Sequence, residues 1–341
     1  MIEYIPWSKD VVQDALNAVR LGVFSSLDIE LSGKCPYDCI YCETPYRDRK
    51  SQIDFTKIEY LLDTKLFKWV YICGIGEPTY DCNEEYLLRI LSSCKKNGAR
   101  CSIFTNLSNL TERLIQYVED GTLYLIIKYD SLNADKIKNI YHPDNVDIHL
   151  KNLERVYALV KVVDNKTNIA ASIVPTTHNI DEIDSLIDSC LQHGIFPLLG
   201  QLEYSGSAKG VFDIISLDDG VLQAQKDRLE KIMGEEYHVP FCPAVIAGLH
   251  ISNENKITMD RRTGLSCHWF WLDEPKVDAF FDLSDVTDVK DISKKIIDIR
   301  KERYEDFLKI KDSFVTDVFG GCGGNKRDVF DIYQKLMEGG V

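Results

Sequence analysis

Six short apolar segments alternate with helical patterns between residues 26 and 201, and this alternation limits the possible folds more than any other feature of the chain. The strand-like segments are residues 26–31, 68–73, 101–105, 123–128, 168–174 and 196–201, and the helical patterns lie near 56–65, 84–97, 111–119, 147–161 and 180–193. Strands that alternate with helices predict βαβ units and a parallel sheet. Six such units fit either a partial α/β barrel or an open doubly wound sheet, and periodicity alone does not choose between them.

The pattern changes on both sides of this region. Residues 8–22 predict an amphipathic helix with Ser8 as its N-cap. After residue 205 the alternation stops, and the expected elements are a helix near 218–233, a hairpin across 253–264 and a helical tail over 289–312. We therefore expect an N-terminal helix in 1–24, the repeating α/β region in 25–215, and a smaller Cys-containing C-terminal extension in 216–341.

Charge and hydropathy exclude several classes of protein. The 341 residues include 40 Lys and Arg against 54 Asp and Glu, a formal net charge of −14, whereas a general nucleic-acid binder needs a basic surface. No apolar run reaches the roughly 18 residues that span a bilayer, and no signal peptide is evident, so we expect a cytoplasmic protein without membrane contact. In such a protein the 11 cysteines indicate metal binding or catalysis more than disulfides.

Three of these cysteines form a compact motif directly after the first strand. They are Cys35, Cys39 and Cys42, with the spacing C-x3-C-x2-C. Three thiolates on one loop can bind three irons of a cubane cluster, which leaves the fourth iron open to a substrate. The alternative is a zinc site, but zinc takes four ligands, and no fourth ligand is evident near this loop. The spacing favours an iron–sulfur cluster and leaves zinc as the second interpretation.

The second strand ends in a glycine–glutamate segment, Gly74-Ile75-Gly76-Glu77-Pro78. Glycines at the carboxyl end of a parallel strand let the backbone approach a ligand closely. Ligands of α/β sheets and barrels gather at that end, where a carboxylate can receive an ammonium group. Alone, the segment could be a tight turn before a helix. Together with the cysteine motif one strand earlier, it predicts a ligand site.

Over roughly residues 25–205 these motifs resemble those of the radical S-adenosylmethionine (SAM) enzymes. The cysteine loop matches the family's cluster-binding loop, and Tyr41 matches the aromatic residue that lies beside the adenine of SAM. The glycine–glutamate segment matches the motif that binds the methionine amino group, through Gly74, Gly76, Glu77 and Pro78. The resemblance implies a partial barrel of six βα units, a radical-initiating 4Fe-4S cluster and bound SAM.

The resemblance also implies further contacts and a reaction. Asn106 after the third strand, and Lys128 and Asp130 at the end of the fourth, are expected to contact the ribose or the methionine carboxylate of SAM. A flavodoxin- or ferredoxin-type protein would donate one electron. Reductive cleavage of SAM would then give a 5′-deoxyadenosyl radical that removes a hydrogen atom from the substrate. The sequence singles out no catalytic side chain beyond these.

A second set of cysteines, Cys242, Cys267 and Cys322, lies in the Gly-rich C-terminal extension. The pattern resembles the SPASM and shorter twitch extensions of the family and implies one auxiliary 4Fe-4S cluster. A twitch region closes with a C-x2-C pair, but here the second position of that pair is Asn325. The fourth ligand is therefore Asn325 or another donor side chain, or it is absent and leaves an iron open to the substrate.

Two substrate classes remain for this reaction, in which the auxiliary cluster would anchor or oxidise the substrate. The short segment before the first strand leaves no separate peptide-recognition domain, which favours a small polar metabolite such as a sugar, nucleoside or aminocyclitol over a peptide. Gln201, Glu203 and Tyr204 would face this substrate at the barrel mouth. The other interpretations are a zinc-stabilised binding protein without enzymatic activity, and an enzyme acting on transfer RNA, which the charge of −14 disfavours.

Overall fold

The six expected strands are consecutive neighbours in one sheet of the computed structural model, which describes residues 2–45, 49–72, 74–80, 82–233, 242–260, 265, 277–310 and 326–339. They are β2 (Ser26–Ile29), β3 (Trp69–Ile72), β4 (Arg100–Thr105), β5 (Leu123–Lys128), β8 (Ile169–Ile173) and β9 (Phe196–Leu199). Every neighbouring pair among these strands is parallel. The parallel α/β class is therefore confirmed.

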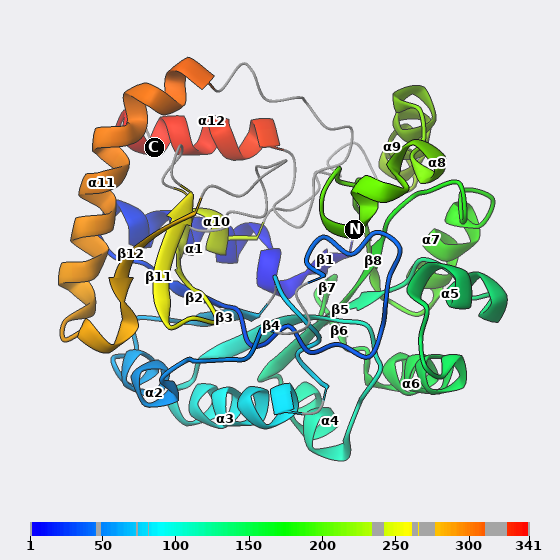
Figure 1. Cartoon of the computed structure of the whole chain (residues 1–341), viewed down its shortest axis with the longest axis horizontal. Coiled ribbons are helices and arrows are strands. Elements are labelled where there is room, and N and C mark those ends of the chain that lie inside the picture. The colour runs from blue at the N-terminus through cyan, green and yellow to red at the C-terminus, as the bar shows by residue number, and fades with distance from the viewer. Residues whose placement is uncertain are drawn as a thin grey trace.

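Helices connect these strands around the outside of the sheet (Figure 1). The expected ones are α2 (Phe55–Asp63), α3 (Cys82–Asn97), α4 (Glu112–Glu119), α6 (Val146–Leu159) and α7 (Ile183–Gln192), and α1 (Lys9–Arg20) begins after Ser8 as predicted. One further helix, α5 (Ala134–Tyr141), was not expected. Its start is marked by a cap, because the Asn133 side chain accepts from the Asp135 and Lys136 amides.

The sheet is an open, partial barrel. Its strand order is β12–β11–β10–β2–β3–β4–β5–β8–β9, and within the described ranges the edge strands β12 and β9 do not pair with each other. Strands β2, β3 and β9 are buried along their whole length, as strands of a parallel sheet are when helices cover one face and the lumen the other. The choice that periodicity left open is therefore settled in favour of the partial barrel.

The C-terminal extension continues this sheet. Strand β10 (Gly248–Ile251) lies parallel to β2, and β11 (Lys256–Asp260) and β12 (Val277–Asp282) follow in antiparallel order. The expected hairpin turn at residues 254–256 is present, with Asn255 at a φ of +63°. The sheet thus runs across the boundary expected near residue 215.

Buried polar contacts attach the extension to the barrel. His250 Nδ1 of β10 lies 2.9 Å from Asp28 Oδ2 of β2, and both side chains are about 1% exposed. The Arg300 guanidinium of α11 (Val289–Ile310) donates to the Ile246 carbonyl at 2.6 Å and lies 4.9 Å from the Phe24 ring centre. Breaking a buried ionic contact of this kind by removing one partner costs about 3–5 kcal/mol, so the extension is held firmly.

The remaining elements close the ends of the barrel. The N-terminal β1 (Glu3–Tyr4) and the 3-10 turn η1 (Ile5–Trp7) pack at the amino ends of the strands, where β1 pairs with β7 (Lys166–Thr167) beside β6 (Val162–Val163). After β9 come η2 (Gly206–Gly210), α8 (Phe212–Ile215) and α9 (Asp219–Met233), and the extension adds α10 (Ala244–Ala247), η4 (Leu283–Asp285) and α12 (Lys326–Met337). The amino ends of the strands are thereby covered, and the cavity opens at the carboxyl ends.

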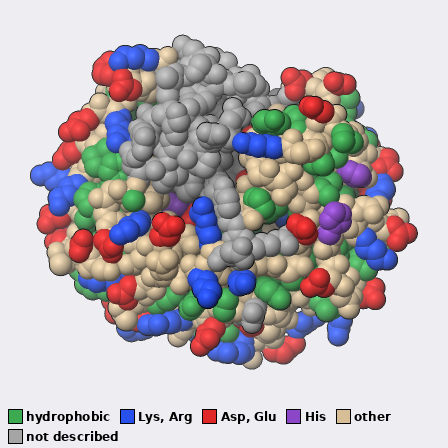
Figure 2. Space-filling model, in the orientation of Figure 1, with side chains coloured by type: hydrophobic (Ala, Val, Ile, Leu, Met, Phe, Trp, Pro, Cys, Tyr) green, Lys and Arg blue, Asp and Glu red, His purple; other side chains and the backbone are tan. Residues whose placement is uncertain are grey.

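Two surface properties bear on function. On the face that Figure 2 shows, the basic side chains of the described residues are interspersed with acidic ones. Among the described residues, none of the helices has the length and apolar character needed to cross a membrane.

Candidate cofactor site

The three cysteines of the first motif lie in the wall of a cavity of about 230 Å³ at the carboxyl ends of the strands. Cys39 is buried, whereas Cys35 and Cys42 are partly exposed. The loop is held by the end of α5, because the Asp38 amide donates to the Tyr141 carbonyl and the Ile40 amide to the Ile140 carbonyl, each at 3.0 Å. The helix that sequence reasoning missed therefore supports the cysteine loop.

The glycine–glutamate segment lies directly against the chain that leads into this loop. Gly76 has a φ of +67°, and a Cβ atom there would lie 2.0 Å from the Ser32 carbonyl oxygen, so only glycine fits. The Glu77 amide donates to the Lys34 carbonyl at 2.8 Å. The two motifs are therefore in direct backbone contact at Gly76 and Glu77.

Glu77 presents a buried carboxylate to the cavity. Its side chain is 3% exposed and has no described basic side chain within ion-pair distance. Oε1 accepts from the Thr79 hydroxyl at 2.8 Å and the Thr105 hydroxyl at 2.7 Å, and Oε2 accepts from the Asn106 amide at 2.7 Å. Burial raises the pKa of Glu77, and these hydrogen bonds oppose the rise without cancelling it. Oε2 can accept one more donor, so the site suits an ammonium group.

Asn106 connects Glu77 to the cysteine loop. Besides its amide bond to Glu77, its Nδ2 atom donates to Cys35 Sγ at 3.4 Å, and its side chain lines the cavity. Hydrogen bonds to a cluster's thiolates tune its potential. The expectation that Asn106 lies at the cofactor site thus has a specific geometry, in which one residue contacts both motifs.

Tyr41 and Lys128 also line the cavity, and Asp130 lies behind them. The Tyr41 hydroxyl donates to Asp130, and Asp130 Oδ2 also accepts from Tyr141 at 2.8 Å. Lys128 Nζ lies 4.8 Å from the centre of the Tyr41 ring. Asp130 is fully buried and is not part of the cavity wall, so the structure places it as a support for Tyr41 and not as a direct contact to a cofactor.

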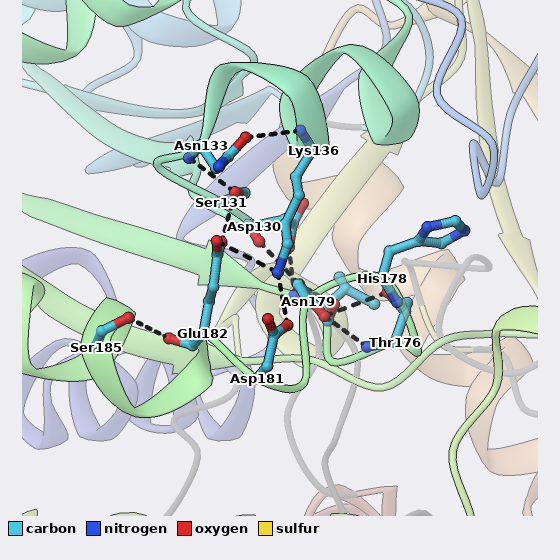
Figure 3. Close-up of polar contacts among 11 residues, drawn as sticks. Asp130, Ser131, Asn133, Lys136, Thr176, His178, Asn179, Asp181, Glu182 and Ser185 are labelled. Atoms are coloured by element: carbon cyan, nitrogen blue, oxygen red, sulfur yellow. Dashed lines mark hydrogen bonds and ion pairs between the residues drawn. The ribbon is translucent and has the colours of Figure 1, made fainter.

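Figure 3 shows how Asp130 itself is held at the ends of β5 and β8. Asn179 Nδ2 donates to the Asp130 carbonyl at 2.9 Å and to the Val174 carbonyl at 3.1 Å. Close by, the Ser131 hydroxyl donates to Glu182 at 2.6 Å. This network keeps two strand ends at a fixed separation, which defines the cavity wall beneath Tyr41.

Burial controls the electrostatics of the thiols. It raises the pKa of Cys35 and of Cys39 to about 12, with the Glu77 carboxylate adding to the effect at Cys35 and Lys128 opposing it at Cys39. For Lys128, burial lowers the pKa, but Cys39 and Asp130 raise it overall, so the ammonium form prevails. The metal-free Cys35 and Cys39 thiols are therefore protonated at neutral pH, and metal binding would release their protons.

The opposite wall of the cavity contains Gln201 and Glu203, as expected for residues at the barrel mouth. Tyr204 is half exposed and does not line the cavity. Gly206 belongs to the loop that follows, and its contact with the cysteine loop was not expected. It has a φ of +49°, and a Cβ atom there would lie 2.2 Å from the Cys42 carbonyl oxygen, so η2 packs directly on the end of the cysteine loop.

Cys242 lies away from this cavity. Its side chain is 8% exposed. Cys242 is a neighbour of Tyr71 in β3, because it adds to the rise that burial causes in the pKa of the Tyr71 hydroxyl. The adjacent Pro243 contacts a small hollow beside Ser26 and Trp69, the first residues of β2 and β3. Cys242 is therefore at the amino ends of strands whose carboxyl ends carry the first cysteine motif. Cys267 and Cys322 lie outside the described residues.

In the described ranges, no three Cys, His, Asp or Glu side chains gather closely enough to hold a single metal ion. A cubane cluster makes a different demand, because each thiolate binds its own iron. Three thiols on one loop that faces a cavity fit that demand.

Comparison with known proteins gives the family. Residues 29–190 match the model of the Radical SAM superfamily, while no curated protein matches the sequence. Among solved structures, SuiB of Streptococcus suis bound to S-adenosylmethionine is similar at 17% identity with a TM-score of 0.59, over 85% of this chain and 72% of that one. anSMEcpe with bound AdoMet and Cp18Cys peptide is similar at 12% identity with a TM-score of 0.59, over 92% and 96%.

The matched residues contain both motifs of the cavity and most of the parallel sheet. The two solved structures share the fold over most of this chain. On the match of residues 29–190 and this open parallel barrel, the chain is an enzyme that carries a domain of the radical SAM superfamily.

Proposed function

We propose that this cavity binds a 4Fe-4S cluster and SAM side by side and that the enzyme removes a hydrogen atom from a polar substrate in the same cavity. The observation that carries the proposal is the position of Asn106, whose side chain contacts Cys35 and whose backbone contacts Glu77. Because one residue contacts both the thiol and the carboxylate, the cavity suits a cofactor that would reach the cluster and also present an ammonium group to Glu77.

Each residue of the site has a proposed role. Cys35, Cys39 and Cys42 would each bind one iron and leave the fourth iron open. When bound, the cluster and SAM supply a one-electron reduction and a carbon-centred radical. Glu77 would receive the methionine ammonium group, and Lys128 its carboxylate, so the two buried charges complement a zwitterion. Tyr41, held by Asp130, would lie beside the adenine.

The glycines and Pro78 would serve this site through the backbone. Gly76 lets the Glu77 segment reach the Lys34 carbonyl, and Gly74 has a φ of +99°, a conformation that favours glycine. The Thr44 hydroxyl donates to the Gly74 carbonyl at 2.5 Å, which joins the two motifs a second time. Pro78 limits the conformations of the chain just after Glu77.

For the substrate we favour a small polar molecule. The cavity wall opposite the cysteine loop combines apolar side chains with the polar groups of Ser172, Gln201 and Glu203. A few convergent polar groups in an apolar wall are typical of small-molecule sites. A peptide is the second candidate, and the observation that favours it is the similarity over 92% of this chain to a structure described with a bound peptide.

We further propose that Cys242, Cys267 and Cys322 bind one auxiliary 4Fe-4S cluster that anchors or oxidises the substrate. What supports this is the position of Cys242 at the opposite ends of β2 and β3 from the first cysteine motif. An auxiliary cluster there would face the substrate from the other side of the barrel. A flavodoxin- or ferredoxin-type protein is the proposed electron donor.

Replacing Cys35, Cys39 and Cys42 together by Ala should abolish SAM cleavage. The variant should lose about four irons per chain, because three thiolates are removed from one cubane cluster. The measurement is 5′-deoxyadenosine formed under reductant after anaerobic reconstitution, with iron and sulfide content. Cys190→Ala, a buried cysteine outside the cavity, is the matched control and should keep both. Deoxyadenosine from the triple variant at the parent's rate would contradict the assignment.

Glu77→Gln should weaken SAM binding by about tenfold or more, because a charge-assisted hydrogen bond to the ammonium group is lost. Cluster content should be unchanged. Affinity is measured by titrating SAM into the reconstituted protein. The matched control is Glu84→Gln, which alters a partly buried carboxylate that bonds Thr111 and Asn109 outside the cavity. Equal affinity in the parent and Glu77→Gln proteins would show that Glu77 does not bind the ammonium group.

The same variant has an expected pH signature in the metal-free protein. Burial raises the pKa of Glu77 above its ordinary 4.5, so its contribution to stability is present below that pH and is lost as the pH rises through the folded value. The Glu77→Gln variant has no ionisable group at this position, so its stability does not fall in this way as the pH rises. The melting temperature of Glu77→Gln minus that of the parent should therefore increase between about pH 4 and neutral pH. If this difference in melting temperature stayed constant over that range, Glu77 would not be a buried group that ionises with a raised pKa.

Transfer of an isotope from the substrate to 5′-deoxyadenosine can distinguish a small-molecule substrate from a peptide substrate. An extract of the source organism grown in heavy water is divided by ultrafiltration into small-molecule and peptide fractions, and each is given to the reconstituted enzyme with unlabelled SAM. A hydrogen atom taken from the substrate appears as deuterium in 5′-deoxyadenosine. We expect deuterium from the small-molecule fraction. Deuterium from the peptide fraction alone would replace our first candidate by the second.

Replacing Cys242, Cys267 and Cys322 by Ala should lower iron by about four per chain and leave SAM cleavage without substrate measurable. The physical reason is that the first motif, at the other end of the barrel, keeps its own three thiols. Iron content and deoxyadenosine are measured on the same samples. Unchanged iron would rule out the auxiliary cluster.

A further inference from the structure

Asn83, in the first turn of α3, is fully buried between the two loops that form the cofactor site. It does not line the cavity, and no motif in the sequence points to it. Its position is nevertheless central, since the segment from Ser32 to Lys34 leads into the cysteine loop on one side and Glu77 lies on the other.

The side chain of Asn83 uses its whole hydrogen-bonding capacity on these two segments. Its Oδ1 atom accepts from the Ser32 amide at 3.2 Å and from the Ser32 hydroxyl at 2.6 Å. Its Nδ2 atom donates to the carbonyls of Ser32 at 3.2 Å, Lys34 at 3.3 Å and Glu77 at 3.0 Å. One amide group thus joins the residue before Cys35 to the backbone of Glu77.

Only a side-chain amide of this length meets these requirements. The site needs an acceptor on one side and donors toward backbone carbonyls on the other, and a carboxylate would set a second oxygen against those carbonyls. Alanine would leave the buried Ser32 amide and the Lys34 and Glu77 carbonyls with fewer hydrogen-bond partners. Other links between the two loops include the Glu77–Lys34 backbone bond, the Thr44 hydroxyl bond to the Gly74 carbonyl and the contacts of Asn106.

We propose that Asn83 is a positioning residue that fixes the separation between Cys35 and Glu77, and hence between the cluster and the ammonium subsite for SAM. This inference rests on the proposed function of the two motifs. Asn83 would act through the Lys34 and Glu77 carbonyls, to which its side-chain amide donates. A ligand that must reach an iron and Glu77 together is sensitive to this spacing, since a misplacement of about 1 Å can cost a hundredfold in rate.

The test compares Asn83→Ala with Asn168→Ala. Asn168 is also a buried amide, which donates to the Leu159 carbonyl at 3.2 Å and accepts from the Lys161 amide at 2.9 Å, at the amino end of β8 away from the cavity. Three quantities are measured: iron content, SAM affinity of the reconstituted protein, and hydrogen exchange of residues 32–35 and 76–79 in the metal-free protein.

We expect Asn83→Ala to keep its iron, to bind SAM at least about tenfold more weakly, and to exchange faster in both segments. Asn168→Ala should lose stability without these changes. Ser32→Ala removes the 2.6 Å hydrogen bond to Asn83, together with the longer contacts of the Ser32 hydroxyl to the Lys34 amide at 3.4 Å and to Cys82 Sγ at 4.0 Å. It should give about a threefold loss of SAM affinity. If Asn83→Ala does not fold, Ser32→Ala carries the test.

Two outcomes would overturn the inference. One is SAM affinity within about twofold of the parent in Asn83→Ala, or in Ser32→Ala where the first does not fold. The other is an equal loss of affinity in Asn168→Ala, which would reduce the effect to general stability. If the parent protein itself bound no cluster, the proposed function would fail instead. Unchanged exchange in the metal-free Asn83→Ala or Ser32→Ala protein would then reject the positioning role by itself.

Discussion

The rest of the site depends on one contact, the close approach of two backbone segments at the carboxyl ends of β2 and β3. Gly76 lies so near the Ser32 carbonyl that no side chain fits, and the Glu77 amide bonds the Lys34 carbonyl. Parallel neighbouring strands bring their carboxyl ends together, so this contact follows from the sheet topology. It sets the cysteine loop beside the buried carboxylate, and Asn83 and Asn106 then fix the arrangement from two sides.

The site contains ionisable side chains in buried positions, where burial disfavours their charged forms. Glu77 is buried among neutral donors, and its raised pKa shows that the folded chain stabilises its ionised form less than water does. Such a group lowers stability without a ligand and strengthens binding of a cation that displaces water. Lys128 is the opposite case, because nearby acidic groups keep it charged. A zwitterionic ligand would satisfy both side chains at once.

The C-terminal extension is part of the same architecture. It adds three strands to the first edge of the barrel, and buried contacts of His250 with Asp28 in β2 and of Arg300 with the Phe24 ring attach it there. An open barrel has an edge that must be paired or covered, and the extension covers it with strands of its own. This arrangement places Cys242 at the amino ends of β2 and β3, opposite the first cysteine motif.

The sequence by itself determined the six parallel strands, their helices and the position of both motifs at strand ends, because strand and helix periods and motif spacing are local properties of the chain. It also indicated Asn106 and Lys128 as cavity residues. The partial barrel that the motifs implied is confirmed by the strand order. Only the tertiary structure decided that α5 supports the cysteine loop and that Asp130 stands behind Tyr41. The roles of Asn83 and Gly206 were likewise invisible in the sequence. These features depend on hydrogen bonds and close approaches between segments distant in the chain, and no local pattern encodes which donor will meet which acceptor.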